Sequence, residues 1–102
     1  MNADIQAPTE EPILLHQRDE RGVHTLTLNA PRSFNALSSP MLGLLQDSLD
    51  RIAADPQARA VVIAARGKAF CAGHDLKEMR ATPEADFYRD LFARCSRMML
   101  SI

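Results

Sequence analysis

The small-residue segment 65–79 has the composition of a loop that positions backbone N–H groups for chemistry. An apolar run, 61–65, leads into it, a polar, helix-compatible run, 75–80, leads out, and Gly67 and Gly73 lie between them. A strand that ends in such a loop and then opens a helix leaves N–H groups unpaired at the positive end of a helix dipole. Such groups suit an anion, or an oxygen that becomes negative during a reaction. The segment therefore predicts an anion or oxyanion site.

Side chains in the same segment suggest two other kinds of chemistry. His74 and Asp75 are a possible metal-binding pair, and Cys71 with His74 a possible nucleophile and base. Adjacent residues face different ways, however, and His16 and His24 lie on a distant predicted hairpin, so we expect no metal site. Cys71 is more typical of a small hydrophobe that packs into the core.

Two further alternatives give the segment a simpler role. Gly67 and Lys68 begin to resemble a phosphate-binding loop, but Ala69 stands where that pattern requires serine or threonine. Without further information the glycines also fit a plain structural turn. Asp75 and Glu78 are typical of acids at the start of a helix rather than of catalytic carboxylates.

The elements that must hold this loop begin with a predicted β-hairpin. Residues 13–18 are a short strand candidate, and a turn that ends in glycine joins them to a second strand at 23–29. That second strand alternates, with His24, Leu26 and Leu28 on one face. The pattern predicts one face toward the core.

A helix and a third strand complete a predicted βαβ crossover. Ser38 or Ser39 can cap the helix, and Pro40 suits its first position. Residues 60–65 contain no polar side chain, which predicts a strand buried on both faces in a parallel sheet with 23–29. The loop then lies at the carboxyl end of that strand, where open α/β sheets usually bind ligands.

Two helices are predicted after the loop. The first spans 75–81, with Asp75 in its first turn, and the second follows Thr82 and Pro83 and runs to Ile102. The second helix carries one apolar stripe, formed by Phe87, Leu91, Cys95 and Met98 and widened by Tyr88, Phe92 and Met99. We expect this stripe to pack on a part of the fold outside this chain, or on another subunit.

Composition limits the class of protein. The chain has 102 residues, a net charge of −1 and 46% hydrophobic residues, as expected for one soluble domain at most and not for a nucleic-acid binder. No apolar run approaches the roughly 18 residues of a membrane span. Cys71 and Cys95 lack CxxC spacing. Residues 1–12 predict a disordered tail without a targeting pattern, which favours the cytoplasm.

Three segments together resemble the crotonase (enoyl-CoA hydratase/isomerase) superfamily: 23–29, 31–37 and 70–76. The resemblance runs from about Ile13 to the last residue, and the Gly-His-Asp-Leu-Lys-Glu loop is similar to that of enoyl-CoA hydratase domain-containing proteins. It implies an α/β fold, namely the N-terminal part of a crotonase-like domain over residues 13–102. It also implies an acyl-CoA-binding protein related to lyases of fatty acid metabolism.

The resemblance implies roles for individual residues. The backbone N–H of His74 donates to the thioester carbonyl oxygen as part of an oxyanion hole, and its imidazole is incidental to that donation. Arg32, Ser33 and Ala36 correspond to contacts with the adenine and phosphates of coenzyme A, with Lys77 as a further cation. The implied substrate-binding set is Arg32, Ser33, Ala36, Ala72, Gly73, His74, Asp75, Leu76 and Lys77. No cofactor is implied besides the coenzyme A of the substrate, and family analogy suggests a homotrimer.

The resemblance also implies missing parts. The second oxyanion donor and the acid/base glutamates of the hydratases lie beyond Ile102 in family order. We therefore expect the N-terminal part of a crotonase-fold protein that has no hydratase turnover by itself. The alternatives are a non-catalytic binder of CoA esters, or a chain without independent activity that persists through subunit packing.

Overall fold

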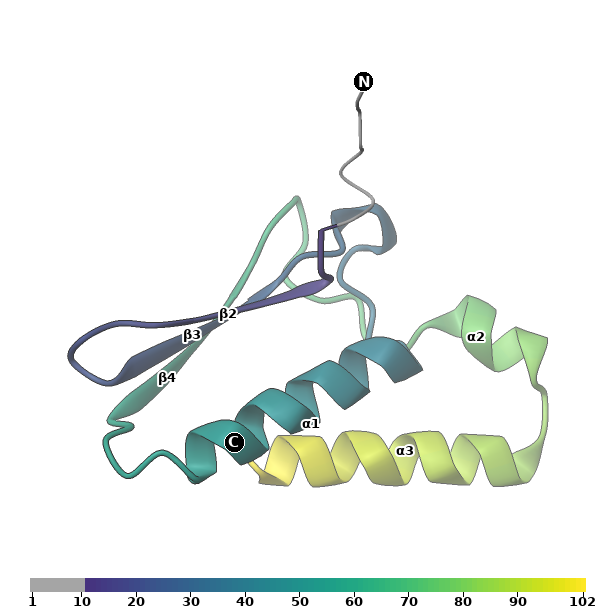
Figure 1. The fold of residues 1–102 in the computed structure, drawn as a ribbon. Helices are drawn as coiled ribbons and strands as arrows, with labels where there is room; N and C mark the ends of the chain where they lie inside the picture. Colours follow the sequence, from purple (N-terminus) through teal and green to yellow (C-terminus); the bar gives the residue numbers. More distant parts are fainter. Residues whose placement is uncertain (1–10) are drawn as a thin grey trace, which may run out of the picture.

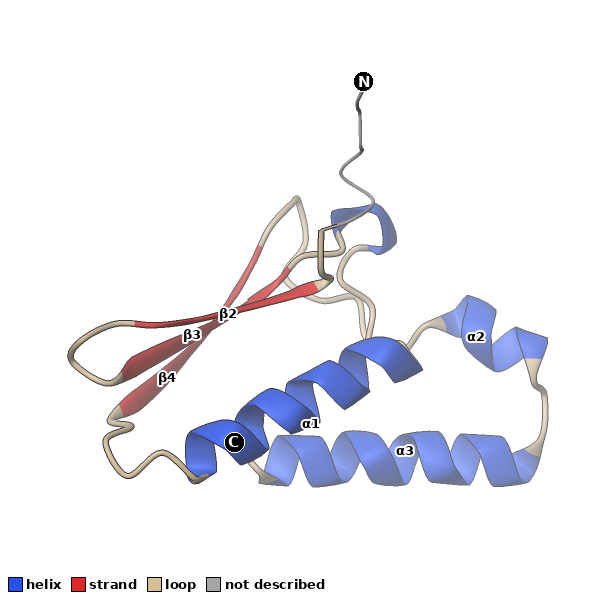
Figure 2. Ribbon diagram, viewed as in Figure 1, coloured by secondary structure: helices blue, strands red, loops and turns tan. Residues whose placement is uncertain are grey.

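A computed structural model of the protein describes residues 11–102, which form a mixed α/β structure with one sheet and three α-helices (Figures 1 and 2). The tail predicted over residues 1–12 lies, apart from its last two residues, outside the described residues. The elements are β2 (Leu14–Arg18), β3 (Val23–Leu28), the 3-10 turn η2 (Pro31–Ser33), α1 (Ser39–Ala53), β4 (Ala60–Ala65), α2 (Leu76–Ala81) and α3 (Ala85–Leu100).

The sheet has the strand order β2-β3-β4. β2 and β3 are antiparallel, with Leu14 opposite Leu28, which confirms the predicted hairpin. β3 and β4 are parallel, with Leu28 beside Ala65, and α1 lies between them in the chain. The predicted βαβ unit is therefore confirmed, and the loop after β4 leaves the sheet at its carboxyl end.

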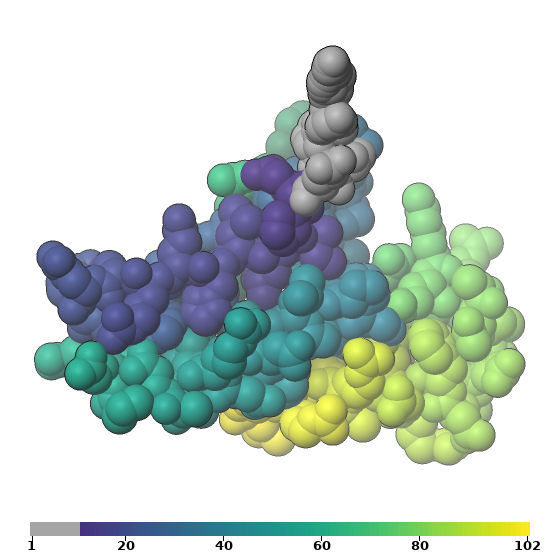
Figure 3. Space-filling view, viewed as in Figure 1, coloured from purple at the N-terminus to yellow at the C-terminus, as the bar shows by residue number. Residues whose placement is uncertain are grey.

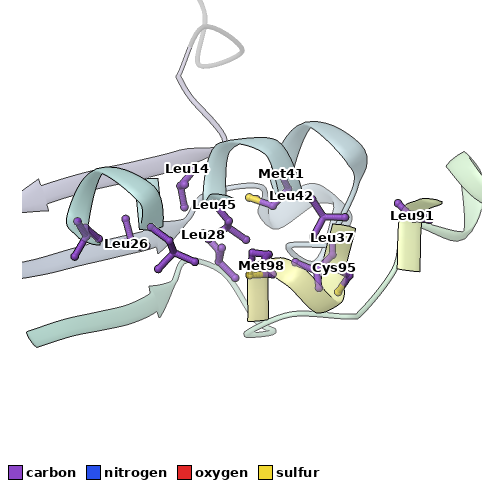
Figure 4. Packing of buried hydrophobic residues seen from close by; sticks show 12 residues of the cluster. Leu14, Leu26, Leu28, Leu37, Met41, Leu42, Leu45, Leu91, Cys95 and Met98 are labelled. Atoms are coloured by element: carbon purple, nitrogen blue, oxygen red, sulfur yellow. The ribbon is translucent and has the colours of Figure 1, made fainter. Parts of the chain in front are cut away.

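One face of the sheet packs against α1. His24, Leu26 and Leu28 are buried while the residues between them are half-buried, so the predicted alternation of this strand is confirmed. Leu26 from β3 and Met41 from α1 are both fully buried and belong to one core cluster. Figure 4 shows how the leucines of the strands, the loop and α1 converge with the side chains of α3.

The start of α1 follows from local sequence chemistry. Ser38 is the N-cap, and its Oγ accepts the backbone N–H of Met41 at 3.3 Å. The helix thus begins at Ser39, and Pro40 occupies its second position rather than the first. Proline is tolerated there because this N–H has no partner within the helix.

β4 differs from its prediction. Val62 is 47% exposed and Ala60 is exposed, so the strand is not buried on both faces. Within residues 11–102, β3 is the only strand that pairs with β4, and this leaves the outer edge of β4 uncovered. Ala60 and Val62 are two positions apart and so lie on the same face of the strand, and the described part of the chain leaves this face uncovered as well as the edge.

The apolar stripe of α3 also differs from its prediction. Leu91, Cys95 and Met98 are buried in one cluster with residues of α1, so α1 of the same chain supplies the surface on which they pack. In Figure 3 the yellow end of the chain, in α3, lies alongside the teal of α1. Phe92 and Met99, which widen the stripe, remain exposed. The helix ends at Leu100, two residues before the predicted end. No helix among the described residues is long and apolar enough to cross a membrane.

Candidate functional site: the Gly73–His74 peptide

The peptide group between Gly73 and His74 is fixed from one side. The Gly73 carbonyl oxygen accepts the N–H of Leu37 at 2.7 Å, and Leu37 and His74 form a parallel β-bridge. Because a trans peptide is planar, its C=O and N–H point in opposite directions. The His74 N–H therefore points away from Leu37, and within residues 11–102 it donates to no acceptor. It is a backbone donor held in one direction.

Gly73 is required here for its conformation. Its φ is +93°, a region that residues with a side chain rarely adopt. A Cβ at this position would meet no atom within 4 Å, so free space is not what selects glycine. The positive φ turns the chain so that the next N–H faces outward.

The start of α2 is occupied by its own side chain. Asp75 is the N-cap, and its Oδ1 accepts the backbone N–H groups of Lys77 at 3.0 Å and Glu78 at 3.3 Å. The N–H groups that the sequence suggested for an external anion are thus partly satisfied by this carboxylate. The His74 N–H, just before the helix, is not among the groups that this carboxylate satisfies.

Asn35 holds the loop after β4 in place through the hydrogen bonds of its side chain. The sequence did not single out this residue. Its side chain is fully buried, and Nδ2 donates to the carbonyl oxygens of Arg66 at 2.9 Å and Ala69 at 3.0 Å. Its Oδ1 accepts the N–H of Ala30 at 2.7 Å. A buried amide must satisfy its polar groups, so this residue fixes both ends of the first half of the loop. The available signal was a polar residue beside the apolar pair Ala36 and Leu37.

The half-buried imidazole of His74 packs against α3. Its ring lies 4.9 Å from that of Phe92 on α3, centroid to centroid, at 56° between the planes. Its Nδ1 is buried and has no hydrogen-bond partner among residues 11–102. The side chain therefore anchors the loop on α3, while the backbone N–H of the same residue stays available.

The predicted binding residues fall into two groups. Ala36 is buried next to Leu37 and so lies beside the loop, where Ala72, Leu76 and Lys77 are exposed. Arg32 and Ser33 are exposed on η2 and line a separate hollow of about 300 Å³. The residues that line this hollow are Glu11, Ile13, Asn29, Ala30, Pro31, Arg32 and Ser33, with none from the loop after β4.

Neither the thiol nucleophile nor the metal site has a supporting contact among residues 11–102. The sulfur of Cys71 accepts the Gly73 N–H at 3.4 Å, and the side chain packs against the buried core. Burial raises the pKa of the Cys95 thiol, with a smaller contribution from Cys71. In the described part of the chain, no group of three histidine, cysteine or acidic side chains is placed to hold a metal ion.

Comparison with known proteins identifies the family. The family model described as enoyl-CoA hydratase/isomerase matches residues 23–102. The chain belongs to this family. The enoyl-CoA hydratase domain-containing protein 3 of Rattus norvegicus, described as mitochondrial, is 35% identical over 95 residues, which are 93% of this chain and 32% of that protein. Enoyl-CoA hydratase EchA19 of Mycobacterium tuberculosis is 40% identical over 70% of this chain and 27% of its own length.

Solved enoyl-CoA hydratase structures share the fold. An enoyl-CoA hydratase from Mycobacterium smegmatis superposes with a TM-score of 0.89 at 62% identity, over 90% of this chain and 36% of that one. The human enoyl-CoA hydratase domain-containing protein 3 gives 0.80 at 31% identity, over 89% and 36%. The crotonase-type fold expected from the sequence is thus confirmed. This enoyl-CoA hydratase/isomerase family member spans about a third of the length of the relatives it matches.

Proposed function

We propose that this protein binds acyl-CoA thioesters and that the His74 backbone N–H donates to the thioester carbonyl oxygen. The observation that carries the proposal is the pinned Gly73–His74 peptide, whose carbonyl is held by Leu37 at 2.7 Å. A donor already fixed in direction requires no reorganisation when negative charge develops on the oxygen it faces.

The surroundings of this donor support the same ligand. Leu76 is 67% exposed immediately after the loop, and Phe70 is exposed within the loop before Gly73, so apolar surface flanks the donor on both sides in the chain. Such surface suits an acyl chain. Lys77 and Arg32 are exposed cations that can pair with the phosphates of coenzyme A.

In the whole fold, this donor would form one half of an oxyanion hole for a thioester enolate, in a hydratase, isomerase or hydrolase. Loss of one oxyanion donor typically costs on the order of 10²–10³ in rate. We therefore infer that these 102 residues bind the thioester without turning it over, because one donor without an acid/base pair is insufficient. A location in the cytoplasm and assembly into a homotrimer remain predictions.

Amide NMR of the ¹⁵N-labelled chain tests the binding proposal. Crotonyl-CoA should move the His74 amide proton downfield, as expected when a free N–H gains an acceptor. Free coenzyme A, which lacks the thioester carbonyl, should move it less, and the Ala93 amide within α3 serves as an internal control. An unmoved His74 amide at saturating crotonyl-CoA would contradict the proposal.

The same sample tests the inference about turnover. Hydration of crotonyl-CoA in the presence of the chain should equal the rate in buffer. A rate that rises in proportion to the protein concentration would show that the described residues suffice for catalysis.

A further inference from the structure

One carboxylate near the loop bonds a different helix from the one that carries it. Glu78 belongs to α2, yet its two oxygens accept the backbone N–H of Ser39, the first residue of α1, at 3.0 and 3.2 Å. That N–H has no partner within its own helix. Ser38 meanwhile accepts the N–H of Met41, so the start of α1 is capped by two side chains from separate parts of the chain.

The local sequence predicts another partner for this carboxylate. Asp75 and Glu78 have the spacing of a capping box, in which the glutamate would bond the N–H of its own N-cap. In the structure Asp75 caps α2 alone, and Glu78 turns to α1. The carboxylate therefore connects two helices and does not stabilise only its own.

This connection closes a small frame around the candidate donor. Segment 37–39 is joined to segment 73–78 at both ends, by Leu37 N–H to the Gly73 carbonyl at 2.7 Å and by Ser39 N–H to Glu78. Arg94 of α3 donates to the Ser39 carbonyl at 3.2 Å, so the first residue of α1 is hydrogen-bonded to α3 as well as to α2. The frame contains the peptide whose N–H belongs to His74.

We propose that Glu78 is a positioning residue that sets the direction of the His74 N–H. Its carboxylate fixes segment 37–39 against the loop, and the Leu37–Gly73 hydrogen bond transmits that position to the Gly73–His74 peptide. The consequence for thioester binding rests on the proposed function, whereas the geometric effect concerns the free protein and can be measured without any ligand.

Four variants separate positioning from simple helix stabilisation. Glu78→Ala removes the link between the helices. Ser38→Ala removes a cap from the same end of α1 without touching α2, and Glu84→Ala removes an exposed acid that makes no side-chain cap hydrogen bond. Glu78→Gln keeps a carbonyl oxygen that can accept the Ser39 N–H, and so tests rescue by a conservative change.

The free protein gives the first result. Glu78→Ala should shift the His74 amide resonance and speed hydrogen exchange at the Leu37 amide, with Glu78→Gln between it and the wild type. Ser38→Ala and Glu84→Ala should leave both signals unchanged. The proposal is overturned if Glu78→Ala leaves them unchanged, or if Ser38→Ala reproduces the effect. If Glu78→Ala does not fold, Glu78→Gln is compared with Glu84→Gln. Equal hydrogen-exchange rates at the Leu37 amide in these two variants would overturn the proposal.

Binding gives the second result. Crotonyl-CoA affinity should fall about tenfold in Glu78→Ala, because the loop that carries the donor would then have to be ordered on binding. Affinity should stay at the wild-type value in Glu84→Ala. A wild-type chain that does not bind crotonyl-CoA would contradict the proposed function, while the His74 and Leu37 signals of the free protein would still decide the role of Glu78.

Discussion

Leu37 and His74 lie side by side in a parallel β-bridge, and the Leu37 N–H holds the carbonyl of the peptide that carries the His74 N–H. Two segments that are far apart in the chain therefore determine the direction of one backbone donor. The donor depends on main-chain geometry, so substitutions that alter backbone conformation should affect it more than substitutions that alter side chains.

Gly73→Ala should distort the candidate site. The residue has φ of +93°, and a side chain in such a region costs of order 1–3 kcal/mol, so the free energy of unfolding should fall by about that amount. Crotonyl-CoA binding should weaken as well. If the chain relieves the strain by rotating the Gly73–His74 peptide, the His74 N–H no longer points in the same direction. Urea unfolding and a binding titration measure the two effects.

Gly43→Ala is the matched control for this substitution. Gly43 lies within α1, and a Cβ there would meet nothing within 4 Å. Alanine should therefore raise the free energy of unfolding by about 0.5–1 kcal/mol through helix propensity, without affecting binding. Equal stability changes at Gly43 and Gly73 would contradict the role given to the positive φ.

His74→Ala should preserve the donor and weaken its anchoring. The substitution keeps the backbone N–H but removes the contact with the Phe92 ring at 4.9 Å, so stability should fall by about 1 kcal/mol. Phe92→Ala should cause a similar loss, while Met99→Ala, at an exposed position on the same helix, should cost about 0.5 kcal/mol or less. Binding that is abolished in a folded His74→Ala variant would indicate that the imidazole, and not the N–H, contacts the ligand.

Asn35→Ala should be among the most destabilising single substitutions near the site. It removes the hydrogen bonds to Ala30, Arg66 and Ala69 and leaves one N–H and two C=O groups in part-buried positions without these partners, which should cost about 3 kcal/mol. Asn29→Ala removes a side-chain hydrogen bond at the surface and should lower the free energy of unfolding by about 1 kcal/mol or less. Denaturant unfolding compares the two, and a loss no larger at Asn35 than at Asn29 would contradict the role of Asn35 in holding the loop.

Acid should destabilise the end of the sheet away from the loop. The backbone N–H of Gln57, then His24 at 2.9 Å and Arg18 at 3.0 Å, lower the pKa of Asp55 from an ordinary 3.8 to about 2. The folded state therefore binds this proton less tightly than the unfolded state. The stabilisation is present above about pH 4 and is lost as the pH falls toward about 2.

His16 extends this effect to milder acid. Burial, together with the charges of His24 and Arg51, lowers the pKa of His16 below its ordinary 6.5, and its Nε2 lies 2.9 Å from Nδ1 of His24. Because the folded state resists protonation here, stability should decline as the pH falls below 6.5. His16→Gln should flatten this part of the melting-temperature profile.

Asp55→Asn should flatten the acid part of the same profile. The exposed Asp86→Asn, which loses only a surface pair with Arg89, should leave the whole profile unchanged. Identical profiles for the wild type, Asp55→Asn and His16→Gln between pH 7 and 3 would contradict the linkage.

The amino-acid sequence by itself determined the local features of this protein. The alternation of His24, Leu26 and Leu28, the cap at Ser38 and the glycine before His74 predicted the strand, the helix start and the loop. Each of these depends on residues within a few positions of one another, and local patterns record such short-range preferences. The three family segments had the same advantage, since each is contiguous in the chain.

Only the tertiary structure decided how these features meet. It directed Glu78 to α1 rather than to its own helix, and it packed the stripe of α3 on α1. It also placed Leu37 against Gly73, which sets the direction of the His74 N–H. These contacts join segments distant in sequence, so they arise from the packing of whole elements, and no local pattern specifies the partner of a side chain that can reach two helices.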